Sequence, residues 1–81
     1  MITEEEFDKL IGNVVRFRYR NGRECTGLID GKWEPISSHY YSLNHGLNKN
    51  DVIEAVSREE ITSAEILPKV EALIWRIEND I

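Results

Sequence analysis

The spacing of apolar residues changes period along the chain, and each period predicts a different element. Val15, Phe17 and Tyr19 alternate with polar residues, which is the two-residue period of a half-buried strand. The C-terminal apolar residues instead follow the i, i+3, i+4, i+7 spacing of an amphipathic helix that begins at Pro68: Val70, Leu73, Ile74 and Ile77, continued by Ile81. The pattern therefore predicts strands first and a helix last.

The first residues carry the signals of a helix start. Thr3 is placed as an N-cap, and Glu6 three residues later completes a capping box. Ile2 and Phe7 have the spacing of a hydrophobic staple. We expect Gly12 to be the C-cap, so that this helix spans roughly two turns.

Turn-forming residues divide the middle of the chain into five short strands. Asn21-Gly22 predicts a tight hairpin after the first strand, because both residues tolerate a positive φ. The second strand is expected over 23–29, with a bulge or bend at Gly27 and a turn at Asp30-Gly31. The remaining expected elements follow in order: a loop at Glu34-Pro35, a strand over 38–43, a polar hairpin loop over 44–51, a strand over 52–56, a helical turn over 57–60 and a strand over 62–67.

These elements favour a mainly β fold. Five short strands with a tight first hairpin and a bent second strand predict a small closed or nearly closed barrel, with a short helix at the start and an amphipathic helix at the end. An open sheet half covered by a helix is the alternative. With 81 residues, the chain has room for one domain over 1–81.

Composition narrows the class of protein. The sequence has 15 acidic and 10 basic residues and a net charge of −5, which argues against general duplex binding, since phosphate affinity comes from Lys and Arg. Cys25 is the only cysteine, so an internal disulfide is excluded, and its place in a strand predicts a buried structural thiol. We expect a cytoplasmic protein, because a single cysteine fits a reducing compartment and the N-terminus is acidic where a secretory signal would be basic. We expect no membrane contact, because the apolar runs are far too short for a membrane span.

The basic charge is concentrated in the first hairpin. Residues 11–50 hold six basic and three acidic side chains, whereas 51–81 hold three basic and eight acidic ones. We expect one strand face to carry Arg16, Arg18 and Arg20, with Arg23 just past the turn. On the structural interpretation, cross-strand carboxylates or the helices pair with them, the candidates being Glu24, Glu54 and Glu65.

The functional interpretation combines these arginines with nearby aromatic residues. Trp33, Tyr40 and Tyr41 would lie beside the basic face and complete a binding surface. Such a surface suits an acidic protein partner, or a single strand of RNA with stacked bases.

Other chemistry has little support. His39 and His45 lack a matching thiol or carboxylate cluster, so no metal or other cofactor is expected. The chain also lacks a recognisable nucleophile–base signature, so we do not expect an enzyme.

Successive residues of an α-helix are rotated by about 100°, which places Trp75 away from the apolar stripe of the C-terminal helix. Two interpretations stay open: it packs on the rim of the barrel, or it is an exposed anchor for another chain. On the second interpretation Trp75, Ile74 and Ile77 are candidates for self-association into a homo-oligomer.

The run from Phe7 to Gly27 resembles the first motif of Sm-like proteins, in which a short helix ending in L-x-G leads to an alternating strand, an N/D-G-R turn and a strand with G-x-L. The matching positions cover about a quarter to a third of the chain: Leu10, Gly12, Val15, Phe17, Asn21, Gly22, Gly27 and Ile29. The layout and acidity are also similar to the Rof family, small Sm-like proteins that bind the terminator Rho.

The chain departs from the Sm-like pattern where that family binds uridine. Trp33-Glu34 and Ser37–His39 stand near the places of the family's Asp and Asn, and the turn at 57–61 lacks glycine. The resemblance therefore implies a small five-stranded barrel of the Src-homology-3-like or Sm-like kind without the RNA pocket. Together these observations predict a non-catalytic binding module with a protein partner, single-stranded RNA being the alternative ligand.

Overall fold

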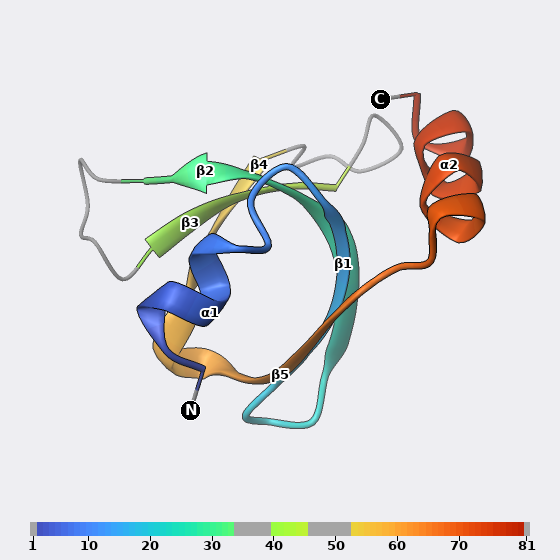
Figure 1. Cartoon of the computed structure of the whole chain (residues 1–81). Helices are drawn as coiled ribbons and strands as arrows, with labels where there is room; N and C mark the ends of the chain where they lie inside the picture. The colour runs from blue at the N-terminus through green and yellow to red at the C-terminus, as the bar shows by residue number, and fades with distance from the viewer. Residues whose placement is uncertain (1, 34–39, 46–52, 81) are drawn as a thin grey trace.

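The computed structural model describes residues 2–33, 40–45 and 53–80 (Figure 1). In chain order its elements are α1 (Glu4–Asp8), β1 (Val14–Tyr19), β2 (Glu24–Lys32), β3 (Tyr40–Asn44), β4 (Ile53–Ser57), the 3₁₀ turn η1 (Arg58–Glu60), β5 (Ile61–Ile66) and α2 (Lys69–Glu78). The prediction of a mainly β chain with five strands and a helix at each end is confirmed. The predicted loop at Glu34-Pro35 and most of that over 44–51 lie outside the described residues.

All five strands belong to one antiparallel sheet in the order β4-β3-β2-β1-β5. The sheet curls around α1, and η1 joins its two edge strands (Figure 1). No hydrogen-bonded ladder joins β4 to β5 in the part of the chain that the structure describes, so the sheet is curled but not closed.

β2 is longer than the sequence suggested. It runs through the predicted turn at Asp30-Gly31, because the register with β3 shifts between Ile29 and Gly31 and absorbs the irregularity as a bulge. Of the bulge or bend predicted at Gly27, the bulge is wrong in place, because the pairing of β2 with β1 shows no register shift there. Gly27 is needed for close packing instead, since a Cβ there would lie 2.5 Å from the Cδ1 of Leu43.

The start of the chain forms as its local signals predict. The Thr3 hydroxyl accepts a hydrogen bond from the Glu6 amide at 3.1 Å, and the Glu6 carboxylate accepts from the Thr3 amide at 3.4 Å. The predicted C-cap is wrong, because α1 ends at Asp8 with Lys9 as its cap. Gly12 lies beyond the helix at a φ of +86°, and its amide donates to the carbonyl of Ile29 at 2.7 Å.

The turn of the first hairpin contains one residue in the left-handed backbone conformation. Gly22 has a φ of +90°, whereas Asn21 is not left-handed. The Asn21 side chain instead accepts a hydrogen bond from the Arg23 amide at 2.9 Å, as in an Asx turn. The turn therefore needs Gly for its conformation and Asn for its side chain.

Alternate side chains of β1 contribute to two hydrophobic clusters on opposite faces of the sheet. Val15 and Phe17 point to the inner face, where they join the main core: Phe7, Leu10, Ile29, Tyr41, Leu43, Val56 and Ile61. Val14 points outward and forms a second, smaller cluster with Leu28 and Leu67. Arg16 and Arg18 follow Val14 on this outer side, so α2 and the arginines share one face of the sheet.

Candidate functional site

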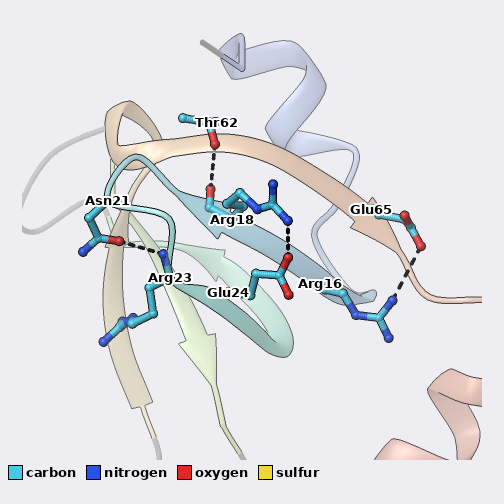
Figure 2. A network of polar contacts seen from close by, with 7 residues as sticks. All are labelled: Arg16, Arg18, Asn21, Arg23, Glu24, Thr62 and Glu65. Carbon is cyan, nitrogen blue, oxygen red and sulfur yellow. Dashed lines mark hydrogen bonds and ion pairs between the residues drawn. The ribbon is translucent and has the colours of Figure 1, made fainter.

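The basic face exists, but its arginines are paired within the chain. The sheet register places Arg16 opposite Glu65 and Arg18 opposite Glu24. Arg18 and Glu24 form a close ion pair, and Arg16 lies 3.9 Å from Glu65 (Figure 2). The bond and charge of Arg18 hold the pKa of Glu24 below its usual range. The structural interpretation of these two arginines is thus confirmed.

The outer two arginines lie past the end of the strand. β1 ends at Tyr19 after a register shift, so Arg20 does not continue the face of Arg16 and Arg18 as predicted. The Arg20 guanidinium donates to the carbonyl of Glu59 at 2.8 Å. That of Arg23 stacks over the Tyr19 ring, 4.6 Å from its centroid.

The three predicted aromatic residues do not form one surface with the arginines. Tyr40 joins Arg23, Tyr19 and Glu54 in lining a shallow pocket of about 350 Å³, but Trp33 is not part of that pocket. Trp33 is half-buried at the end of β2, where its amide donates to the carbonyl of Tyr40.

The prediction that Tyr41 belongs to a binding surface is wrong, because its side chain is fully buried. Its ring packs on Phe7 with centroids 4.3 Å apart, and its hydroxyl donates to Asp8 Oδ1 at 2.7 Å. This bond lowers the pKa of Asp8, and burial raises the pKa of Tyr41 to about 12. Lys32 completes the network with contacts to Asp8 (3.3 Å) and Glu4 (2.7 Å), which ties α1 to the sheet.

The C-terminal helix α2 packs on the sheet with the side opposite to its apolar stripe. Ala72 and Trp75 pack against the outer cluster of Val14, Leu28 and Leu67. Two polar contacts hold the same orientation: Glu71 lies 3.7 Å from Arg16, and Arg76 donates to the carbonyl of Gly12 at 3.4 Å. Trp75 is therefore a packing residue on the sheet, and its proposed role as an exposed anchor is wrong.

The apolar stripe consequently points into solvent. The exposed fractions are 68% for Val70, 58% for Leu73, 49% for Ile74 and 71% for Ile77, with Ile66 at the end of β5 exposed to 46%. We refer to these five residues as the aliphatic face. A groove of about 430 Å³ runs beside this face between α2 and the sheet, and two cations, Lys69 and Arg76, line it. Ile74 and Ile77, two of the predicted candidates for self-association, are both accessible to another chain.

Three polar residues that the sequence left unconnected meet at one end of the curled sheet. Cys25 Sγ in β2 lies 3.7 Å from His45 Nδ1, just after β3. His45 Nε2 lies 2.6 Å from Glu54 Oε2 in β4. These residues are 20 and 9 positions apart, so only the pairing of β2, β3 and β4 brings them together.

Two further findings concern the described residues alone. No group of three His, Cys, Asp or Glu side chains there is arranged to hold a metal ion; His39 lies outside this part of the chain. Neither of the two helices, five and ten residues in length, is long and apolar enough to cross a membrane.

Comparison of the chain with protein-family models, with curated proteins and with solved structures found no match.

Proposed function

We propose that this chain is a non-catalytic binding module whose ligand is another protein chain, bound on the aliphatic face of α2. The observation that carries the proposal is a ten-residue helix with four large aliphatic side chains in solvent. The curled five-stranded sheet and the 3₁₀ turn between β4 and β5 support a fold of the Src-homology-3-like or Sm-like kind, a family of scaffolds that present surfaces rather than deep pockets.

The energetics favour coverage of this face. Burying a Leu, Ile or Val side chain completely is worth about 1.5–3 kcal/mol. The four side chains on α2 are roughly half to two-thirds exposed, so covering them would contribute on the order of 4–7 kcal/mol before the cost of association. Contiguous apolar surface of this kind on a small protein marks an interaction site.

The geometry indicates what the partner presents. α2 is about 15 Å long, too short by itself for the roughly 800 Å² per partner of a stable interface. The partner must therefore also reach the groove, where Lys69 and Arg76 favour acidic side chains. An amphipathic helix meets the apolar requirement, and α2 of a second copy is such a helix.

Two antiparallel copies of α2 would match each other. With Leu73 of one copy opposite Ile74 of the other, Val70 stands opposite Ile77, so every aliphatic position meets another. This arrangement makes a second copy the first partner to test.

The experiment is sedimentation velocity of the whole chain over about 10 µM to 1 mM, with Ile77→Glu and the control Ser63→Glu. Both variants add one negative charge at an exposed position, but Ser63 lies on β5 away from α2. We expect dimers to grow with concentration in the parent and in Ser63→Glu, and to vanish in Ile77→Glu. A monomer throughout, or equal dimerisation of all three chains, would contradict a contact between copies through this face.

Single-stranded RNA is the alternative ligand, because Arg23 and Tyr40 line one shallow pocket. It is the weaker candidate, since each of the four arginines already contacts a carboxylate or a backbone carbonyl. Gel retardation of a single-stranded RNA at low salt tests it: binding through phosphates would fall steeply as salt rises. Absence of retardation would remove this alternative.

A further inference from the structure

Cys25, His45 and Glu54 form a series of proton-transfer partners that the binding function does not use. The thiol contacts one nitrogen of the ring and the carboxylate contacts the other, at 3.7 Å and 2.6 Å. A nucleophile, a base and a group that orients the base, arranged in this order, are what activation of a weak nucleophile requires. The serial arrangement suits proton transfer better than metal binding, for which the donors must surround one point.

The contact with Glu54 determines which nitrogen can act as base. An ionised carboxylate only accepts hydrogen bonds, so Nε2 of His45 must carry the proton in the 2.6 Å contact. In the neutral ring Nδ1 is then unprotonated, and it is the atom that faces the thiol. Proton transfer from Cys25 to Nδ1 would leave an imidazolium between a thiolate and a carboxylate.

The surroundings support this charge distribution. The His45 side chain is only 10% exposed, so its ring is held in place, whereas Cys25 is partly exposed at the margin of the main core. Among the described residues, the other titratable groups that face the thiol are Tyr19 from β1 and Arg23 from the hairpin turn. The guanidinium of Arg23 favours a thiolate, and its 3.9 Å contact with Glu54 partly balances that carboxylate.

We propose that Cys25 is a covalent modification site, activated by His45 and Glu54, that reacts with small disulfides such as glutathione disulfide. The Cys25 thiol gives its proton to His45, and the thiolate attacks one sulfur of the disulfide. The S–S bond of the small molecule breaks as the new one forms, and the leaving thiolate takes the proton from His45. The products are a mixed disulfide on Cys25 and one free thiol, so the oxidant is the small disulfide itself.

The first test follows the reaction of the whole chain with 5,5′-dithiobis(2-nitrobenzoate), an aromatic disulfide that releases a coloured thiolate. Cys25 is the only cysteine, so all of the signal reports this residue. An ordinary thiol, with a pKa of about 8.5, reacts about 25-fold faster at pH 9 than at pH 7, because the thiolate fraction rises by that factor. We expect a rise of less than about fivefold for Cys25. A rise of about 20-fold or more in the parent chain would overturn the proposal.

The ratio of the two rates cancels differences in access to the thiol, which allows variants to be compared. We expect His45→Gln to restore a ratio near 25, and Glu54→Gln to move it in the same direction. The control Glu65→Gln changes a strand carboxylate at the other edge of the sheet and should keep the parent ratio. Equal ratios in the parent, His45→Gln and Glu54→Gln would show that the neighbours do not act on the thiol. Circular dichroism verifies that each variant is folded.

The second test uses glutathione disulfide at pH 7, with intact-mass spectrometry as the readout. We expect the addition of one glutathionyl group that dithiothreitol removes, formed several-fold more slowly in His45→Gln. If the parent chain stays unmodified while the unfolded chain in denaturant is modified, the thiol is shielded and the proposal is wrong. This result is independent of oligomeric state, so it can fail or succeed separately from the binding function.

Discussion

The orientation of α2 predicts an unusual order of stability among substitutions on one helix. Trp75 packs on the outer face of the sheet although it lies off the apolar stripe, whereas Ile77 lies on the stripe and is 71% exposed. Replacing each residue by Ala distinguishes the observed orientation of α2 from the conventional orientation, in which the apolar stripe faces the core. Trp and Ile have similar helix propensities, so the gain in propensity on changing to Ala is similar for both.

The magnitudes follow from burial. A fully buried Trp loses about 3–5 kcal/mol on change to Ala, and for the partly buried Trp75 we expect about 2 kcal/mol. Ile77→Ala removes a side chain that is mostly in water, so the change should stay within about 0.5 kcal/mol. In a domain of this size 1 kcal/mol corresponds to about 4–8 °C in Tm. We therefore expect Tm to fall by about 10 °C in Trp75→Ala and by about 3 °C or less in Ile77→Ala.

The assay is thermal and urea unfolding followed by far-ultraviolet circular dichroism, since fluorescence would be altered by the loss of a Trp. Measurement at about 5 µM keeps any contact between copies from stabilising the aliphatic face. A greater loss in Ile77→Ala than in Trp75→Ala would mean that the stripe faces the sheet. The aliphatic face would then not be exposed in solution.

Three other substitutions test individual contacts of the fold. Gly27→Ala places a methyl group 2.5 Å from the Leu43 side chain, so we expect a loss of about 1–3 kcal/mol in urea unfolding, and an unchanged stability would contradict the close approach. Tyr41→Phe removes the hydroxyl that lowers the pKa of Asp8. A carboxyl group whose pKa is lower in the folded than in the unfolded state stabilises the fold at pH values above the unfolded pKa, and this stabilisation is lost as the pH falls through the folded pKa. The variant should therefore be less stable than the parent by about 1 kcal/mol at pH 7 and equally stable near pH 2. Thr3→Ala removes the N-cap hydroxyl and should cost about 1 kcal/mol, whereas Thr3→Ser should restore most of it.

Features that depend on near neighbours follow from the sequence alone. The capping box at Thr3 and the turn at Gly22 need only residues within four positions, so local chemistry predicts them. The alternation of β1 placed Arg16 and Arg18 on one face and made cross-strand carboxylates their candidate partners, whereas the register of the sheet assigned Glu65 to Arg16 and Glu24 to Arg18. The limit of this reasoning appears at Tyr41, which an aromatic-rich strand could present to either side and which the structure buries.

Which surfaces stay exposed depends on how the elements pack against one another. An amphipathic stripe predicts that a helix has an apolar side, but not what that side meets. Here Trp75 and Ala72 pack over Val14 and Leu28, so the opposite, aliphatic side of the helix faces water. The meeting of Cys25 with His45 and Glu54 has the same origin: three residues spread over thirty positions become neighbours because β2, β3 and β4 pair in this register. The pattern of apolar and polar residues shows which face of each helix or strand is apolar, whereas packing and strand register determine which of these faces come into contact.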